Sequence, residues 1–356
     1  MKYLYLYLYL YLSLCLSLSG CAAGPQEVKR RYFWPPPPDE PRVEFIASYW
    51  SADDFPRTAK QKFLESVTGL EPARGFEKPW GIASNGEGKV YIVDTNLQAV
   101  VVFDLKNYTV DLLGKGGLSS LFWAPVGVTL DANGNVYVSD PRRNRVYSFT
   151  KDEKPLMTIG DDATLSWPTG MAVDNKLKRL YVVNGKSHNI SVFDLDGKYL
   201  FSIGKRGDGD GEFNFPTDVD VDSKGNLVVA DSMNARVQIL DPEGRFIRKF
   251  GQRGDRAEDF QIIKGIAVSK DDNIYVVDGR ADRILVFNKE GEPLTSIGGT
   301  AMIAETMKLN PGGFLIPQDI DIDKNDTIYV VDSMNKRFQV FQIINEEWLK
   351  RHPIER

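Results

Sequence analysis

Four aspartates stand at positions where they could hold a metal ion. Asp218 and Asp220 alternate along one strand-like run and Asp319 and Asp321 along another, so each pair projects from one face of a strand. Because Ca²⁺ prefers carboxylate oxygens, one hypothesis is a calcium site built from both pairs. The alternative, which we favour, is that each carboxylate accepts hydrogen bonds from neighbouring backbone or arginine groups and that the protein has no cofactor.

Histidine and cysteine are too scarce for most catalytic centres. The chain contains two histidines, His188 and His352, and two cysteines, Cys15 and Cys21. A zinc centre with several histidine ligands needs more histidines, and the spacing of Cys15 and Cys21 does not give the Cys-x-x-Cys-His motif of a haem attachment. No Ser-His-Asp arrangement is suggested either. We therefore expect a binding protein rather than an enzyme, with His188 in an exposed loop.

An aspartate and an arginine recur five residues apart at four places in the chain. At this spacing the two side chains would lie at opposite ends of a hairpin loop, where a carboxylate and a guanidinium can pair through two hydrogen bonds. We predict structural turn pairs at Asp140 and Arg145, Asp231 and Arg236, Asp278 and Arg283, and Asp332 and Arg337.

These pairs belong to a unit that recurs six times and reads as three short strands, as in Pro216–Leu240. The central residues of the copies are 44 to 54 residues apart, at Asp94, Asp140, Asn184, Asp231, Asp278 and Asp332. Five copies are followed by a fourth strand-like segment, and the sixth is not. We therefore predict an all-β, six-bladed β-propeller over residues 75–344, whose ring is closed by a strand at Arg42–Trp50.

One copy, Pro125–Phe149, resembles the NHL-repeat family in its proline start, Gly-Asn turn, Val-Tyr-Val-x-Asp strand and Asn-x-Arg-Val return. The resemblance extends over about three quarters of the chain, because the same signature recurs at the same offsets. It implies a propeller fold and no particular reaction. Related six-bladed lactonases hold calcium with acidic side chains, so a calcium-dependent hydrolase or lactonase that uses the channel aspartates is an alternative function.

The first residues have the features of a bacterial lipoprotein leader. Residues 1–20 read as a signal peptide, and Leu18-Ser19-Gly20-Cys21 resembles a lipobox, which implies a lipid on Cys21 and a membrane-anchored, extracytoplasmic protein. An uncleaved membrane anchor is the alternative. We expect a proline-rich tether over residues 21–41, a connecting helix over 51–74 and a short helical tail over 345–356.

Charge and composition argue against a nucleic-acid partner, because the net charge is −5 and no basic, aromatic-interleaved stripe is present. The leader followed by NHL-type blades resembles envelope lipoproteins of anaerobic, metal-respiring bacteria, whose relatives accompany multihaem cytochromes. This resemblance implies an interaction scaffold in an envelope complex, with a protein partner, on the outer membrane or its periplasmic face. A carbohydrate or cell-wall binding module is a further alternative, based on the tryptophans.

One face of the propeller is predicted to bind the partner. In propeller blades the loops before the inner strand and the hairpin loops between the second and third strands lie on the same side, and aromatic and arginine side chains are common interface anchors. The alternative is that the aromatic rings pack between blades. The entry loop Gly299–Phe314, which contains Thr300–Asn310, is expected to cover the channel mouth near Asp319. The predicted face comprises Trp80, Trp123, Trp167, Phe213, Phe215, Phe314, Arg142, Arg143, Lys186, His188, Arg280 and Lys336.

Overall fold

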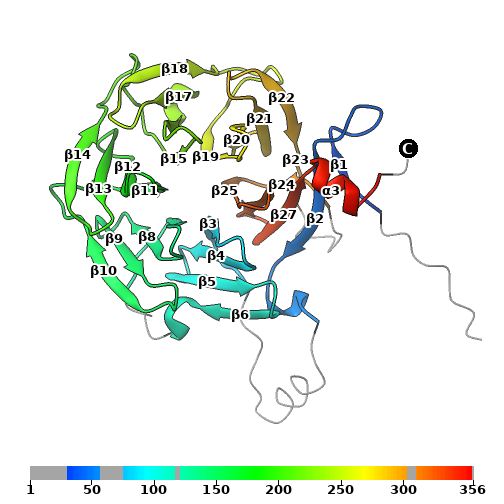
Figure 1. The fold of residues 1–356 in the computed structure, drawn as a ribbon, viewed down its shortest axis with the longest axis horizontal. Coiled ribbons are helices and arrows are strands. Elements are labelled where there is room, and N and C mark those ends of the chain that lie inside the picture. Colours follow the sequence, from blue (N-terminus) through cyan, green and yellow to red (C-terminus); the bar gives the residue numbers. More distant parts are fainter. Residues whose placement is uncertain (1–29, 57–74, 117–120, 303–309, 355–356) are drawn as a thin grey trace, which may run out of the picture. The chain divides into compact units, whose positions relative to one another are not determined.

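Six antiparallel sheets follow one another around a central channel. The structure is a computed structural model that describes residues 30–56, 75–116, 121–302 and 310–354. Residues Tyr32–Arg356 form one compact unit. Within this unit the inner strand of each sheet contacts the inner strands of the sheets on both sides (Figure 1). The predicted all-β, six-bladed propeller is confirmed.

Each of the first five blades consists of four consecutive strands, and the innermost strand comes first in the chain. Blades one and two are β3 (Pro79–Ser84), β4 (Lys89–Asp94), β5 (Ala99–Asp104) and β6 (Thr109–Leu112), then β7 (Gly127–Leu130), β8 (Val136–Asp140), β9 (Arg145–Phe149) and β10 (Pro155–Ile159). Blade three is β11 (Pro168–Asp174), β12 (Arg179–Asn184), β13 (Asn189–Asp194) and β14 (Tyr199–Ile203). Blades four and five are β15 (Asp218–Val221), β16 (Leu227–Asp231), β17 (Arg236–Leu240) and β18 (Phe246–Phe250), then β19 (Ile263–Val268), β20 (Ile274–Asp278), β21 (Arg283–Phe287) and β22 (Pro293–Ile297).

The sixth blade takes its fourth strand from the N-terminal part of the chain. β25 (Pro317–Ile322), β26 (Thr327–Asp332) and β27 (Arg337–Ile343) supply three strands, and β2 (Val43–Tyr49) pairs antiparallel with β27. Because β2 covers β27, the backbone groups on that edge are paired inside the ring. The prediction that Arg42–Trp50 closes the ring is confirmed.

The pairing reaches further toward the N-terminus than the sequence indicates. β1 (Phe33–Trp34) pairs with β2, and the rings of Trp34 and Phe341 lie edge to face with centroids 5.6 Å apart. The last part of the predicted tether therefore belongs to the propeller, because Trp34 packs against apolar side chains of blade six. Cys21 and the predicted signal peptide lie outside the described residues.

The remaining elements are short. The 3₁₀ turns are η1 (Ala52–Asp54), η2 (Leu113–Gly116) and η3 (Ser232–Asn234), and β23 (Gly299–Thr300) pairs parallel with β24 (Gly313–Phe314). α3 (Glu346–Arg351) confirms the short helix predicted in the tail. Most of the predicted connecting helix, at residues 57–74, lies outside the described residues. Within the described ranges, no helix has the length and apolar character needed to cross a membrane.

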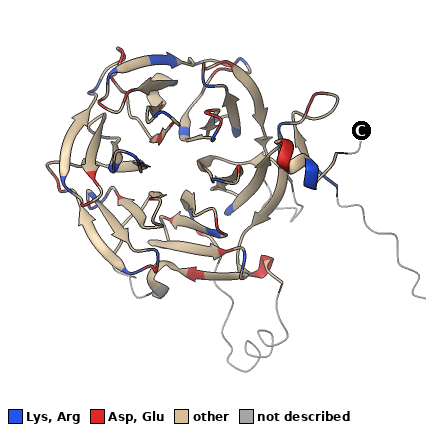
Figure 2. Ribbon diagram, viewed as in Figure 1, with Lys and Arg blue, Asp and Glu red and all other residues tan. Residues whose placement is uncertain are grey.

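The core is divided into clusters that lie between neighbouring blades. Tyr91 and Val93 of blade one, for example, pack with Val136 and Val138 of blade two. The second strands are apolar along nearly their whole length because both of their faces are covered. Charged residues lie mostly at turns and blade edges (Figure 2). Each blade therefore depends on its neighbours for burial.

One buried polar side chain in each blade fixes the loop that leads into its inner strand. The residue at the end of the second strand accepts a backbone N–H from this loop, at 2.6 to 2.9 Å. Burial of a carboxylate is unfavourable unless it is hydrogen-bonded, so these N–H groups stabilise both the side chain and the loop. The six acceptors, which are buried, are Asp94, Asp140, Asn184, Asp231, Asp278 and Asp332.

Two of the predicted turn pairs form. Arg236 Nε and Arg337 Nε each lie 2.7 Å from the Oδ2 of their aspartates, Asp231 and Asp332. Each pair uses one guanidinium nitrogen rather than two. The other nitrogens donate to backbone carbonyls of the preceding loop, such as Gly313 O, except that Arg337 Nη1 donates to Ser48 Oγ. The arginine thus joins the hairpin to that loop.

The other two predicted pairs are wrong. Arg145 Nη1 lies 3.3 Å from Asp162 Oδ1 rather than pairing with Asp140. Arg283 donates to the backbone oxygen of Asp259, and the described residues contain no ion pair between it and Asp278. In both blades the aspartate already accepts loop N–H groups, so it is satisfied without the arginine.

We expect β2 to contribute a large share of the stability of blade six. Phe45 packs against Phe341 with ring centroids 5.7 Å apart, so Phe45→Ala should lower the free energy of unfolding by about 1.5 to 3 kcal/mol. Glu40→Ala, in the exposed loop before β2, is the control. A chain starting at Asp53 should melt at a still lower temperature, and an unchanged melting midpoint for Phe45→Ala would contradict this role.

Candidate functional site

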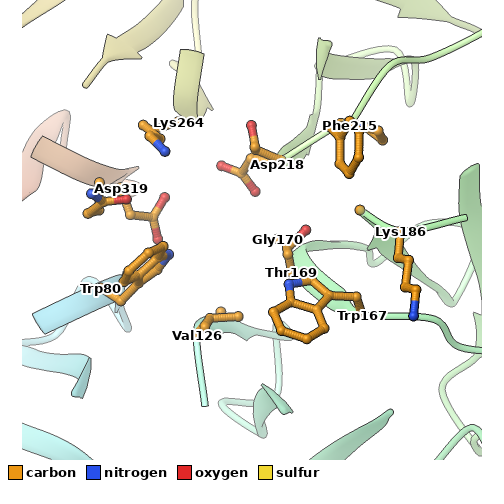
Figure 3. A pocket seen from close by; sticks show the side chains of 15 residues that line it. Trp80, Val126, Trp167, Thr169, Gly170, Lys186, Phe215, Asp218, Lys264 and Asp319 are labelled. Atoms are coloured by element: carbon orange, nitrogen blue, oxygen red, sulfur yellow. The ribbon is translucent and has the colours of Figure 1, made fainter. Parts of the chain in front are cut away.

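One opening of the channel is surrounded by six residues, one from each blade. Each is the second residue of its repeat, directly before or at the start of the inner strand. This opening lies on the face that carries the loops between blades and the hairpin loops, which we call the inter-blade face. The cavity there has a volume of about 450 Å³ (Figure 3). The six residues, which we call the mouth ring, are Trp80, Val126, Thr169, Thr217, Lys264 and Gln318.

Two of the four predicted channel aspartates form the floor of this cavity. Asp218 and Asp319 line both the mouth cavity and the narrow channel beneath it, whose volume is about 50 Å³, whereas Asp220 and Asp321 line only the narrow part. In Figure 3 the Asp218 and Asp319 carboxyls face the centre of the pocket. The structure therefore brings together aspartates from blades four and six, which are not neighbours in the ring.

All four carboxyls join neighbouring blades. Asp218 Oδ2 and Asp220 Oδ2 accept the backbone N–H groups of Ile266 and Val268 in blade five, at 2.9 and 2.7 Å. Asp319 and Asp321 bind Ile82 and Ser84 of blade one in the same way. Across the described part of the chain, no three acidic, histidine or cysteine side chains converge as a metal site requires. The four carboxyls thus make the backbone hydrogen bonds that the hydrogen-bonding alternative describes.

Glycine in the preceding blade leaves room for the two floor aspartates. A Cβ atom at Gly170 would lie 1.9 Å from Asp218 Oδ1, and one at Gly265 would lie 2.8 Å from Asp319 Oδ1. Both distances are too short for non-bonded atoms. The glycine in one blade and the aspartate in the next are therefore a matched pair.

Burial in the channel raises the pKa of all four carboxyls. It raises the pKa of Asp319 from 3.8 to about 7 and that of Asp220 to about 6. The pKa values of Asp218 and Asp321 also lie well above the usual range, first because of burial and then because other channel carboxylates are nearby. The floor therefore carries less negative charge in mildly acidic solution than its composition indicates.

Three bulky residues on the rim are held in the left-handed backbone region. Trp167, Phe215 and Ile316 have φ angles of 58°, 47° and 51°, which is unfavourable for large side chains. Each directly precedes the proline that begins its repeat unit, and each is exposed, by 41 to 48% of its surface. Strained backbone of this kind persists only where surrounding contacts hold it.

The hairpin loop of the preceding blade supplies those contacts. The backbone N–H groups of Trp167, Phe215 and Ile316 donate to side chains of this loop at 2.7 to 2.9 Å. The three acceptors, each four residues after the central Asp or Asn, are Asn144 Oδ1, His188 Nδ1 and Asp282 Oδ1. The same hairpin position is occupied by Gln98, Ala235 and Lys336 in the other blades. The rim positions that these three hairpins face in the next blades are occupied by Ala124, Ile262 and Lys78. None of these three residues has a positive φ angle.

His188 is therefore buried rather than exposed as expected. Its ring packs against Phe215 with centroids 4.4 Å apart, and its Nδ1 accepts the Phe215 N–H at 2.9 Å. Only the neutral imidazole can accept this bond. The pKa of His188 is lowered by burial and then by Arg206, which favours that neutral form.

The predicted binding face is only partly assembled from the expected residues. Phe314 and Phe213 are buried in the core, where Phe314 packs above Gly298, so neither is available to a partner. Trp80 lines the mouth cavity, and the Arg142 guanidinium lies 6.0 and 5.8 Å from the rings of Trp123 and Trp167. Arg143, Lys186, Arg280 and Lys336 are exposed on the inter-blade face. Most of the Thr300–Asn310 loop lies outside the described residues.

Sequence reasoning missed Lys264 and Gln318, the two polar residues of the mouth ring that lack an internal partner. Lys264 is half-buried, its pKa is lowered by burial, and no ion pair or hydrogen bond to its ammonium occurs within the described residues. Gln318 Oε1 is buried and accepts no hydrogen bond. Aligning the six repeats one residue after their first position would have identified both residues.

The opposite face has a larger hollow, of about 780 Å³, in which two of the lysines are paired with glutamates. Lys89 lies 2.6 Å from Glu153, and Lys324 lies 3.1 Å from Glu87. Its walls are turns between strands and contain few apolar side chains. We therefore regard the mouth cavity as the candidate site.

We predict that the propeller is more stable in mild acid than in mild base. A carboxyl whose pKa is higher in the folded than in the unfolded state binds its proton more tightly when folded, so its contribution is present below about pH 4 and is lost as the pH rises through about 7. The melting temperature should decrease as the pH is raised from about 5 to about 8, and Asp319→Asn should make this decrease smaller. Asp111→Asn, on an exposed outer strand, should leave it unchanged. An Asp319→Asn protein with the wild-type pH dependence would contradict this account.

Comparison with known proteins places the repeats among six-bladed propellers. A family model described as a 6-bladed beta-propeller matches residues 170–234 and 223–310. Over 170 residues the chain is 26% identical to peptidyl-glycine alpha-amidating monooxygenase B of Xenopus laevis. The matched region covers 44% of this chain and 18% of that protein. The chain thus spans less than a fifth of the length of the amidating monooxygenases it matches.

Solved structures show the same fold at low sequence identity. A protein of unknown function from Bacteroides thetaiotaomicron superposes with a TM-score of 0.62 at 18% identity, covering 85% of this chain and 76% of that chain. Virginiamycin B lyase of Staphylococcus aureus superposes with a TM-score of 0.54 at 16% identity, covering 75% of this chain and 95% of the lyase. The closed ring of six sheets, the matched family model and the solved structures together show that the chain folds as a six-bladed β-propeller.

Proposed function

We propose that the protein is a lipid-anchored, extracytoplasmic interaction module that docks a protein partner of an envelope complex on its inter-blade face. The observation that supports this most directly is the distribution of exposed apolar side chains. Seven large ones in the described residues lie on the inter-blade face: Trp123, Trp167, Phe215, Met233, Met302, Ile316 and Met334. On the turns of the opposite face there are two, Tyr108 and Leu177.

The clamped rim is a second argument for this face. The backbones of Trp167, Phe215 and Ile316, whose side chains are exposed, are held at unfavourable φ angles by hydrogen bonds from their N–H groups. A side chain that is already fixed in its exposed position loses little conformational entropy when a partner binds it. Strain of this type concentrates at ligand and partner sites. Aromatic anchors next to arginines, such as Trp123 and Trp167 beside Arg142, are the usual centre of an interface.

Charge reversal on this face should abolish partner capture without unfolding the domain. We expect the triple variant Arg142→Glu, Arg143→Glu and Arg280→Glu to lose its crosslinks to the envelope partner. The measurement is crosslinking in native membranes, followed by mass spectrometry. The matched control reverses three exposed lysines on the opposite face, Lys151, Lys224 and Lys289, and so makes the same change in net charge. If the control loses partner capture and the arginine variant retains it, the interface lies on the opposite face and the proposal is wrong.

The anchor is a separate prediction about a residue outside the described part of the chain. Lipid on Cys21 would hold the protein in a membrane, because each buried methylene of an acyl chain contributes about 0.8 kcal/mol. Cys21→Ser should move the protein from the detergent phase to the aqueous phase in detergent partitioning. Cys15→Ser is the control and should partition like the wild type. A Cys21→Ser protein that remains in the detergent phase would disprove lipidation at this residue.

A further inference from the structure

The mouth cavity has the dimensions of a small-molecule site. Its volume of about 450 Å³ falls within the range of about 300 to 1,000 Å³ that is typical of ligand pockets. The channel narrows beneath Asp218 and Asp319, so the cavity opens toward the inter-blade face. A protein surface that only docked a flat partner would need no such depth.

A cation without a partner faces this cavity. Lys264 is on β19, and its side chain crosses Gly279 so closely that a Cβ atom there would lie 2.5 Å from Lys264 Cγ. In Figure 3 its ammonium is directed into the pocket, whereas the Lys186 ammonium is directed away from the centre. Withdrawing an ammonium from water without an anion is unfavourable, and a bound anion would offset that penalty.

A buried acceptor stands next to this cation on the mouth ring. Gln318 is 7% exposed, its Oε1 accepts no hydrogen bond, and it comes from the blade that follows the blade of Lys264. Most buried polar atoms in proteins have a partner, so an unpaired acceptor on a side chain that lines a cavity indicates a residue to which a ligand donor could bind. The ring thus offers one positive charge and one hydrogen-bond acceptor in adjacent blades.

The other walls are aromatic. Trp80, Trp167 and Phe215 surround the mouth in Figure 3. The backbone N–H of Phe215 is bound by His188 and that of Trp167 by Asn144, so the backbone that carries two of these rings is held in place. Flat apolar groups pack well against such rings, because aromatic pairs prefer offset or edge-to-face contact.

We propose that the mouth cavity binds an aromatic carboxylate that also carries a hydrogen-bond donor, with its anion at Lys264, its donor at Gln318 and its ring against Trp80, Trp167 and Phe215. This inference rests on the proposed role of the inter-blade face and adds the chemical class of the ligand. The same chemistry is found in a free small molecule and in the carboxyl terminus of a polypeptide that ends in tyrosine. The experiment distinguishes these two sources.

The first arm measures affinity by calorimetry in mildly acidic buffer, with 4-hydroxybenzoate and its uncharged analogue 4-hydroxybenzamide. The wild-type protein should bind the carboxylate at least tenfold more tightly than the amide. In the Lys264→Met variant, the affinity for the carboxylate should fall to the affinity for the amide. Lys224→Met, on the opposite face, should leave the preference unchanged. Equal binding of acid and amide, no binding of the acid at millimolar concentration, or a preference that survives in a folded Lys264→Met protein would overturn the proposal.

The second arm tests the acceptor with 4-methylbenzoate, which lacks the donor. Gln318→Leu should weaken binding of 4-hydroxybenzoate and leave binding of 4-methylbenzoate unchanged. Equal effects on both ligands would remove Gln318 from the site. Melting curves of every variant establish that it is folded.

The third arm uses short peptides that end in tyrosine with a free or an amidated carboxyl terminus. Tighter binding of the free-terminus peptide than of 4-hydroxybenzoate assigns the pocket to a protein terminus, and weaker binding assigns it to a small molecule. Partner capture is scored separately. If the arginine variant loses its partner while no probe binds, the ligand inference alone fails. If the probes bind and partner capture is insensitive to the arginines, the proposed docking function alone fails.

Discussion

The loops of this propeller depend on one buried side chain per blade, the aspartate or asparagine at the end of the second strand. It accepts backbone N–H groups from the loop that leads into the inner strand of its own blade, in all six blades. Because this acceptor lies at the core, the loop must follow one path over the top of the blade. Everything on the inter-blade face is built on that path, including the mouth ring.

The arginine of the repeat has a smaller role than its recurrence indicates. It pairs with the central aspartate in blades four and six and binds other groups in blades two and five. Blade one has Ala99 in its place, and Asp94 still holds Glu77 and Lys78. What is common to the blades is therefore the acceptor, because a buried acceptor must be satisfied, whereas a guanidinium can reach several alternative carbonyls.

The two halves of the candidate site differ in what holds them. The floor is held by carboxyls that bridge blades four and five, and six and one, and by glycines that leave room for them. The rim is held by hairpin side chains that capture strained N–H groups in the next blade. Both devices act between neighbouring blades. A change in one blade is therefore expected to be felt at the site through its neighbour, without a separate pathway.

The repeat pattern by itself determined the fold, the number of blades and the strand that closes the ring. Strand periodicity and turn residues are local properties, and a missing fourth strand in the sixth copy can be counted. The acidic pairs and the aromatic residues Trp80, Trp167 and Phe215 could also be located in this way, because equal repeat offsets lie at equal radius in a ring. The hydrogen-bonding role of the four aspartates was the favoured alternative because blades four and six are not adjacent in the ring.

Only the tertiary structure decided which of these side chains face solvent, what they contact and what remains unpaired. Phe314 and His188 belong to the predicted face by repeat position, yet one is buried in the core and the other holds a neighbouring loop. The approach of Asp218 to Asp319 joins blades that are not adjacent. Lys264 and Gln318 became significant only once their surroundings showed no partner for them. Satisfaction of a polar group depends on atoms from several blades, and no local pattern in one blade records it.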